Sequence, residues 1–353
     1  MITLVVFIAV LALTWILINL AYRAYLYKYP SISVKYGVLL VVKKSRAIKP
    51  SSVIRKVSVL WTALYVFALV LAVYTTIMSA YTRFTQKEPS VVILVPGISI
   101  TGVDLVFVLI AVCIAASVHE YLHAKVAVSS NIKVKGFGVL VALLLPLAFV
   151  ELDESSFESA SKSSKIKVLA AGIAGNIILY FAASLVLLGL VQSAGILVTS
   201  VDSNSLAEKC GIKPYDVILA VNGTEITSIS VLREYMSIPE NTTLEFTVWR
   251  FNTGLKNITV FKPANTTLLG IRASVTPRLV LAEVLTPHIA FYVVIFTIWL
   301  SIVNFSLALI NALPLYITDG GRIANITLGK RGGVIANSLG VALLALLLMS
   351  SRI

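Results

Sequence analysis

Two histidines and a glutamate lie together in the segment HEYLH, residues 119–123, which ends an otherwise apolar run beginning near residue 105. On a helix, residues four positions apart share a face, so the rings of His119 and His123 can bind one metal ion. Glu120 can reach a water molecule bound to that metal and accept its proton. The spacing therefore predicts a metal centre that activates water for hydrolysis.

The same pattern also occurs by chance, and the alternative is a polar cluster that only joins helices. The apolar setting favours a metal site, because ionisable groups within a membrane helix are costly and usually functional. Three histidines are present in the chain, and only His288 lies outside the segment. We therefore predict one Zn²⁺ per chain, since His-Glu-x-x-His is the zinc metallopeptidase pattern.

A zinc ion held by two histidines needs a third protein ligand and keeps one position open for water. Asp319 is the best candidate, because it is distant in sequence but expected at the same membrane depth, and an acid in an apolar context is usually functional. Asp104 and Glu283 are alternatives, both expected at the external edge. Acids of a segment expected to be solvated are a further alternative: Glu151, Asp153, Glu154 and Glu158.

The composition defines a polytopic membrane protein. The chain has 353 residues, of which 58% are hydrophobic and 13% charged, and its mean hydropathy is +0.94. A net charge of +13 is typical of cytoplasmic loops in such a protein, and no basic soluble domain with interleaved aromatic residues is available to bind nucleic acid. Cys113 and Cys210 are far apart, which excludes a disulfide framework and a Cys-x-x-Cys site. The lipid bilayer is the expected surrounding, with no nucleic-acid partner.

Apolar runs predict about six membrane helices, at residues 1–22, 57–81, 103–123, 168–191, 288–310 and 334–349. The first run could be a signal peptide, but it has no basic start and no small-residue cleavage site, so a retained helix is preferred. The basic stretch 23–56 contains no acid and predicts a cytoplasmic loop that could also contact anionic lipid. Residues 33–42 suggest a short strand within it, and Arg322, Lys330 and Arg331 mark a second cytoplasmic loop.

These helices predict where the metal site lies. Asp104 is near the external start of its helix, and His119 follows 15 residues later, which is about 22 Å of helix. The hydrocarbon core is about 30 Å thick, so the site is expected inside the membrane, in its cytoplasmic half. Residues 136–150 are apolar but interrupted by Gly136, Gly138 and Pro146, which predicts a re-entrant β hairpin beside the site.

The helix at 168–191 carries Asn176 at membrane depth, four residues after Gly172. The small residues at 170–175 allow close helix packing. Asn176 could donate a hydrogen bond to the substrate carbonyl or its developing oxyanion, or it could form a bond between helices. Both interpretations remain open from the sequence.

Residues 195–263 have the charges, alternation and turns of a soluble domain. Segments such as 195–198, 207–218 and 244–250 resemble a PDZ domain of the bacterial protease-associated type, with Tyr215 where that family usually has glycine. Such domains bind chain ends or exposed strands by strand addition, although a module that only restricts access is an alternative. The predicted domains are therefore two helices with a basic loop (1–82), a first part of the membrane core (83–192), an external PDZ-like domain (193–266) and a second part of the core (267–353).

The helix at 288–310 leads to Asn311-Ala-Leu-Pro314 and then to Asp319-Gly320, and Pro314 should end that helix. HEYLH, Gly172-x-x-x-Asn176, the PDZ-like domain and this segment, in this order, resemble the site-2 proteases, which are intramembrane zinc metalloproteases. The resemblance covers roughly residues 95–325. Departures are Tyr316 and Ile317, where many members have proline, and Thr318, where they usually have leucine; these are expected to alter packing and not zinc binding.

Within the site-2 proteases, two features resemble the branch that contains the eukaryotic sterol-pathway enzyme. These features are Pro96-Gly97 before the HEYLH helix and Gly172-Ile173 in place of the commoner Gly-Pro.

The resemblance implies a zinc-dependent endopeptidase that hydrolyses peptide bonds within transmembrane helices of a membrane-anchored regulator clipped beforehand. His119, His123 and Asp319 would bind the zinc, Glu120 would be the general base and Asn176 would steady the oxyanion. The hairpin at 136–150 is expected to hold the unwound substrate, and the protein is expected in the cell membrane. A catalytically inactive adaptor or chaperone of the same fold is the alternative, followed by a zinc transporter; an intact Glu120 argues against the adaptor.

Overall fold

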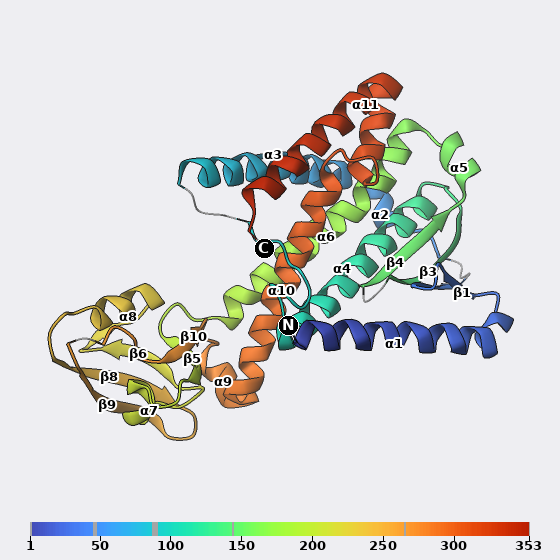
Figure 1. The fold of residues 1–353 in the computed structure, drawn as a ribbon. Helices are drawn as coiled ribbons and strands as arrows, with labels where there is room; N and C mark the ends of the chain where they lie inside the picture. The colour runs from blue at the N-terminus through green and yellow to red at the C-terminus, as the bar shows by residue number, and fades with distance from the viewer. Residues whose placement is uncertain (1, 45–47, 87–90, 143–144, 265, 353) are drawn as a thin grey trace. The chain divides into compact units, whose positions relative to one another are not determined.

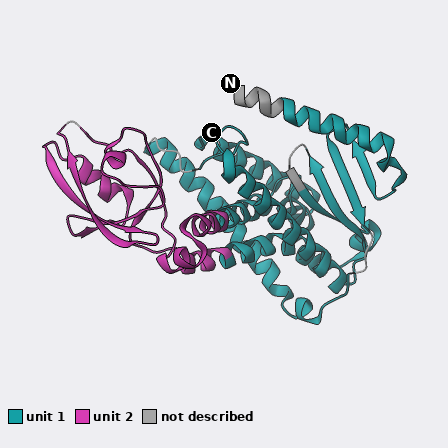
Figure 2. Ribbon diagram, turned by 90° about the horizontal axis from the view of Figure 1, so that it is seen from below, with its two compact units in different colours: residues 1–182, 299–353 teal, residues 183–298 magenta. Residues whose placement is uncertain are grey.

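The computed structural model describes residues 2–44, 48–86, 91–142, 145–264 and 266–352. Two compact units are present, shown in different colours in Figure 2. Unit 1 comprises residues 1–182 and 299–353, and unit 2 comprises residues 183–298. Two long helices continue from one unit into the other, and each unit is described by itself.

Long helices make up most of unit 1 (Figure 1). Its helices are α1 (Ile2–Ala24), the short η1 (Leu26–Lys28), α2 (Ser52–Lys56), α3 (Ser58–Thr85), α4 (Gly102–Ser129), α5 (Glu154–Ser159), α6 (Lys162–Leu190), α10 (Pro287–Ala312) and α11 (Asp319–Ser350). Small side chains let them approach closely, as the sequence predicted. Ala111 and Ala115 of α4 pack with Val303 of α10, and Ala170, Ala171 and Ala174 of α6 are fully buried.

Five of these helices are long and apolar enough to cross a membrane: α3, α4, α6, α10 and α11. The prediction of a polytopic helical membrane protein is thereby supported. The first predicted helix is present as α1, of which Ala9–Ala24 is an apolar helical segment. The expected number of about six spans stays a prediction.

A four-stranded antiparallel sheet stands beside α4 (Figure 1). The predicted hairpin is present as β3 (Val134–Ala142) and β4 (Leu145–Leu152), whose turn at 143–144 lies outside the described residues. The basic stretch adds two more strands, β1 (Ile32–Lys35) and β2 (Leu39–Lys44), where one short strand was expected. The strand order is β1-β2-β3-β4, which leaves β4 at the edge of the sheet.

Close packing of the sheet explains the glycine that interrupts the apolar pattern of β3. A Cβ atom on Gly138 would lie 2.2 Å from the carbonyl oxygen of Val42 and 2.7 Å from the ring of Phe149. The basic stretch is also joined to β4 through an ion pair between Lys43 and Glu151. The sheet therefore links the N-terminal segment to the hairpin beside α4.

The last part of the chain corrects one prediction. α11 consists of two helical arms separated by non-helical backbone at Gly329 (φ 71°, ψ 179°), so the expected helix at 334–349 lies in the second arm and the break falls directly before Lys330 and Arg331. Arg322, expected in the loop, instead lies on the first arm, which begins at Asp319. The two arms of α11 pack against each other at glycines: a Cβ atom on Gly333 would lie 2.0 Å from the side chain of Asn325. The expected loop is therefore reduced to a tight break at Gly329 between the two arms.

Unit 2 is built around a second sheet with strand order β10-β5-β6-β8-β9, and β7 pairs with β6. Its strands are β5 (Ile196–Val201), β6 (Val217–Val221), β7 (Thr224–Glu225), β8 (Thr242–Arg250), β9 (Gly254–Lys262) and β10 (Ile271–Ser274), and its helices are α7 (Leu206–Lys209), α8 (Ile229–Met236) and α9 (Leu279–Leu285). Alternate residues of β8, among them Leu244, Phe246 and Val248, are fully buried in its core. The likeness to a PDZ domain stays a prediction.

A buried ion pair in unit 2 gives a test of its stability. Asp216 is 1% exposed and accepts hydrogen bonds from Arg250 Nε at 2.7 Å, Arg250 Nη2 at 2.6 Å and the Lys213 amide at 2.8 Å. These hydrogen bonds to Asp216 raise the pKa of the Arg250 guanidinium. Replacing Arg250 with alanine leaves a buried carboxylate without its counter-charge, which should lower the free energy of unfolding of this unit by about 3 kcal/mol.

Limited proteolysis of the full-length protein across a urea series would measure this change, because cleavage within 183–298 reports the unfolded population. Arg272→Ala, which removes an exposed arginine of β10, is the matched control and should shift the midpoint little. Equal midpoints for the two variants would contradict a stabilising role for the pair.

Candidate metal centre

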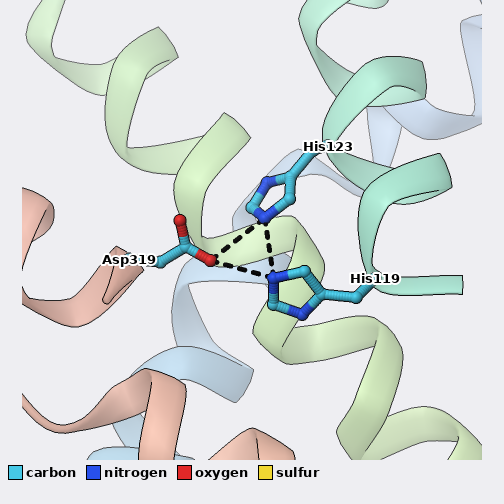
Figure 3. A group of neighbouring side chains, drawn as sticks. All are labelled: His119, His123 and Asp319. Atoms are coloured by element: carbon cyan, nitrogen blue, oxygen red, sulfur yellow. Dashed lines mark hydrogen bonds and ion pairs between the residues drawn. The ribbon is translucent and has the colours of Figure 1, made fainter. Parts of the chain in front are cut away.

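The structure brings His119, His123 and Asp319 together from two helices that are far apart in sequence (Figure 3). The Nε2 atoms of the two histidines are 2.9 Å apart, and they lie 3.1 Å and 3.0 Å from Asp319 Oδ2. Both histidines are 8% exposed. Three potential ligand atoms thus converge in a site shielded by protein.

The α6 helix shapes the space around the two histidines. The Nδ1 atom of His123 donates a hydrogen bond to the carbonyl oxygen of Val168 at 2.6 Å. Because a carbonyl only accepts, Nδ1 carries the hydrogen in neutral His123, and Nε2 then has the lone pair that a metal ion would use. A Cβ atom on Gly172 would lie 2.3 Å from this nitrogen and 2.7 Å from Nε2 of His119. The absence of a side chain at position 172 therefore keeps the space beside both nitrogens open.

Asp319 is positioned by the start of α11. As predicted, α10 ends just before Pro314, at Ala312. Thr318 is the N-cap of α11: its hydroxyl accepts a hydrogen bond from the Gly321 amide at 3.2 Å and donates one to the carbonyl oxygen of Leu313 at 2.7 Å. Thr318, noted from the sequence only as a departure from the family pattern, thus connects the turn to the helix that carries Asp319. Its position directly before an Asp-Gly pair was the signal that could have identified the cap.

Two glycines and the last helix hold this turn in place. A Cβ atom on Gly320 would lie 2.2 Å from the carbonyl oxygen of Ala312. Further along α11, a Cβ atom on Gly340 would lie 2.0 Å from the carbonyl oxygen of Pro314. Gly320 and Pro314, selected from the sequence, therefore act through backbone packing. Asn311, selected with them, donates a hydrogen bond to the Leu307 carbonyl of its own helix at 2.9 Å, and its role stays a prediction.

The three side chains fit a zinc ion. Zinc in proteins takes nitrogen and carboxylate oxygen ligands at about 2.0–2.2 Å in a tetrahedron, which separates ligand atoms by roughly 3.3 Å. The observed separations of 2.9–3.1 Å are close to that value. The fixed tautomer of His123 and the space left by Gly172 also suit a bound cation. A set of two histidines and one carboxylate leaves a fourth position for water, as in hydrolytic zinc sites.

Glu120 contacts the edge strand of the sheet. Its Oε2 atom accepts a hydrogen bond from the backbone amide of Val150 in β4 at 2.8 Å. The strand that borders the site is thus joined to the residue predicted to be the general base. The oxyanion role proposed for Asn176 fits less well, because its side chain is fully buried and its Nδ2 atom lies 3.3 Å from His119 Nδ1.

Four of the six acids considered as alternative ligands have other partners. Glu151 pairs with Lys43, Glu158 pairs with Lys165, and Asp104 accepts a hydrogen bond from Trp299 at 2.7 Å. Asp153 caps α5, and the hydrogen bond from the Ser155 hydroxyl keeps its pKa below the usual range. Among the described residues, the one cluster of three metal-binding side chains is His119, His123 and Asp319.

The site combines a His-x-x-x-His pair, an aspartate and a glutamate beside the first histidine, and apolar helices surround it. This combination is typical of membrane metallopeptidases. Comparison with known families agrees: the model of peptidase family M50 matches residues 107–349, more than half of the chain. The chain therefore belongs to peptidase family M50, the site-2 protease family, whose proteases are membrane metalloenzymes that depend on zinc.

Two curated relatives extend this comparison. An uncharacterized protein of Methanocaldococcus jannaschii is 33% identical over 221 residues, which cover 62% of this chain and 56% of the relative. The membrane-bound transcription factor site-2 protease homolog of Arabidopsis thaliana is 29% identical over 148 residues, covering 40% of this chain and 28% of the relative. The chain thus spans about half or less of the length of these relatives.

Proposed function

We propose that this protein is a zinc-dependent intramembrane endopeptidase that hydrolyses peptide bonds in transmembrane helices of other membrane proteins. The observation that carries the proposal is the convergence of His119, His123 and Asp319, with Glu120 adjacent, on helices apolar enough to span a membrane. Membership of peptidase family M50 supports the same activity. The site would lie in the cytoplasmic half of the cell membrane, with the PDZ-like segment outside.

Each residue of the site would have a separate role in the reaction. His119, His123 and Asp319 would hold the zinc, which supplies Lewis acidity for the attack of water on a peptide carbonyl. Glu120 accepts the proton of the attacking water and then passes it to the leaving nitrogen. The low exposure of both histidines excludes bulk water from the reacting groups.

Substrate unwinding would be supported by the edge strand β4. A transmembrane helix has its amides internally bonded, so a stretch of it must unwind before attack. The outer edge of β4 carries the Val150 amide, which contacts Glu120, so a peptide paired along this edge would run past the general base. We infer that the sheet holds the unwound segment as an added strand.

A cleft in unit 2 would receive a chain end of the substrate. It has a volume of about 560 Å³. One side is formed by β10 and the turn before it, and the other side by α8. Its lining includes Leu269, Gly270 and Ile271 on one side and Leu232, Arg233 and Met236 on the other. An edge strand opposite a helix is the arrangement by which PDZ domains bind peptides. We propose that the substrate is a membrane-anchored regulator clipped beforehand, whose new end is bound there.

Reconstituted full-length protein provides the test of this function. We expect about one zinc per chain and cleavage of a model transmembrane-helix substrate, with cleavage lost on treatment with a zinc chelator and restored by added Zn²⁺. Recovery should follow the zinc content measured on the same sample. Cleavage that persists in chelated, zinc-free protein would contradict the proposal.

The same preparation separates the alternatives. A zinc transporter would move Zn²⁺ across the vesicle membrane, which a fluorescent zinc indicator inside the vesicles would detect. An inactive adaptor would bind zinc and a helical substrate without cutting it, including substrates whose helices are weakened by glycine. Either result would replace the endopeptidase assignment.

A further inference from the structure

One face of α6 lies opposite the two zinc-binding histidines. Val168, Gly172 and Asn176 follow one another at intervals of four residues, so they lie on the same face of the helix. His119 and His123 are likewise four residues apart on α4. The Val168 carbonyl contacts Nδ1 of His123, and the Asn176 side chain lies at Nδ1 of His119. Each histidine thus meets one polar group of α6 on the side away from Asp319.

His123 contacts a backbone carbonyl and His119 contacts a side-chain amide, but both histidines need a hydrogen-bond acceptor at Nδ1. For Nε2 of His119 to bind a metal, that nitrogen must be unprotonated, so Nδ1 carries the hydrogen and needs an acceptor. The Val168 carbonyl supplies such an acceptor to His123 at 2.6 Å. At His119 the corresponding group is the amide of Asn176.

The orientation of this amide follows from the requirement. Asn176 is fully buried, its Nδ2 atom lies 3.3 Å from His119 Nδ1, and its Oδ1 atom has no hydrogen-bond partner within the described part of the chain. A half-turn about the Cβ–Cγ bond exchanges the two atoms with little change in shape, because the amide oxygen and nitrogen are similar in size. In that orientation Oδ1 accepts the hydrogen of His119 Nδ1, and Nε2 is free to bind the metal.

We propose that Asn176 is a positioning residue, which holds His119 in its metal-binding tautomer by accepting a hydrogen bond from Nδ1, and that it does not bind the oxyanion. This inference rests on the proposed zinc site, but it needs no knowledge of the substrate. A fully buried amide that faces the back of a ligand is separated from the reacting carbonyl by the ligand itself. In other zinc sites, replacing a residue that hydrogen-bonds a metal ligand usually lowers metal affinity by roughly 10–100-fold.

Zinc affinity of the purified full-length protein, measured by competition with a chromophoric chelator, tests the proposal. Asn176→Ala should weaken zinc binding by roughly 10–100-fold. Asn176→Asp keeps the acceptor and removes the amide donor, so it should retain zinc affinity within about 3-fold and retain cleavage. The absorption spectrum of the Co²⁺-substituted protein should change in Asn176→Ala and remain like the wild type in Asn176→Asp.

Asn304→Ala is the matched control. Asn304 lies in α10, is fully buried and also has an Oδ1 atom without a partner among the described residues. Its replacement should remove packing contacts and lower the stability of the protein without changing its zinc affinity. The comparison of Asn176→Ala with Asn304→Ala decides the question even if the aspartate variant does not fold.

Two results would overturn the assignment. Unchanged zinc affinity in Asn176→Ala would contradict it, as would an Asn176→Asp protein that binds zinc normally but fails to cleave, since that pattern marks an oxyanion donor. A wild-type protein that binds no zinc would instead contradict the metal centre and the proposed function. The failures of the two proposals are therefore distinguishable.

Discussion

Replacing Glu120 with glutamine is expected to reduce peptide-bond cleavage by about 10²–10⁴-fold, the contribution typical of a positioned general base. Glutamine has the shape of glutamate but cannot accept the proton of the attacking water. Its amide oxygen can still accept the hydrogen bond from Val150, so the attachment of β4 should persist. The zinc content should stay at about one per chain, because Glu120 is not among the three converging ligand atoms.

The measurement is a paired assay of metal content and substrate cleavage on wild type and Glu120→Gln. Glu158→Gln is the control, because it removes a carboxylate that pairs with Lys165 outside the site; cleavage by this variant should match that of the wild type. A Glu120→Gln protein that cleaves within about 3-fold of wild type would show that another group acts as the base. Loss of zinc in this variant would assign Glu120 to metal binding.

The ligand set could be predicted from the sequence because each of its members breaks an apolar pattern. A histidine, glutamate or aspartate inside a membrane helix is conspicuous, and His-x-x-x-His fixes two ligands on one helix face. Asp319 was found by the same reasoning, and the structure places it within 3.1 Å of both histidines. Pro314 also predicted the end of α10 closely, whereas the polarity change before residue 168 did not mark the start of α6, which begins at Lys162.

The features that sequence analysis missed depend on contacts between distant segments. The pairing of β2 with β3 joins residues 39–44 to 137–142, and a short run of alternating residues does not specify its partner strand. The break between the two arms of α11 is confined to Gly329, where the basic residues suggested a longer loop. The capping role of Thr318 and the orientation of Asn176 depend on neighbours that only the fold supplies.

The contact between α4 and α6 illustrates why some site residues look unimportant in a sequence. Gly172 has no side-chain group that can bind, donate or accept, and the sequence assigned it no role beyond close helix packing and a place in the Gly172-x-x-x-Asn176 motif. In the fold it lies between the two polar contacts that α6 makes with His119 and His123. Its contribution to the metal centre is therefore the space that it leaves.

Gly172→Ala should consequently weaken zinc binding by at least about 100-fold, the upper end of the range for residues next to metal ligands. The new methyl group would lie 2.3 Å from His123 Nε2 and 2.7 Å from His119 Nε2, so the imidazoles must move away from the positions that bind the metal. Alanine stabilises a helix by about 1 kcal/mol relative to glycine, so a loss of zinc binding could not be attributed to a weaker α6 helix. Zinc competition and cleavage should both report the effect.

Gly175→Ala, one turn further along α6, separates this effect from general packing. Its Cβ atom would lie 2.6 Å from Leu122 Cδ1, the far end of a flexible side chain that can rotate away. This variant should therefore keep zinc affinity within about 3-fold and retain cleavage. Equal zinc affinity in the two variants would mean that α6 can shift to accommodate a methyl group, and that the space at Gly172 is not required for the metal. A loss confined to Gly172→Ala would show that the distance between α6 and the two histidines is itself part of the metal site.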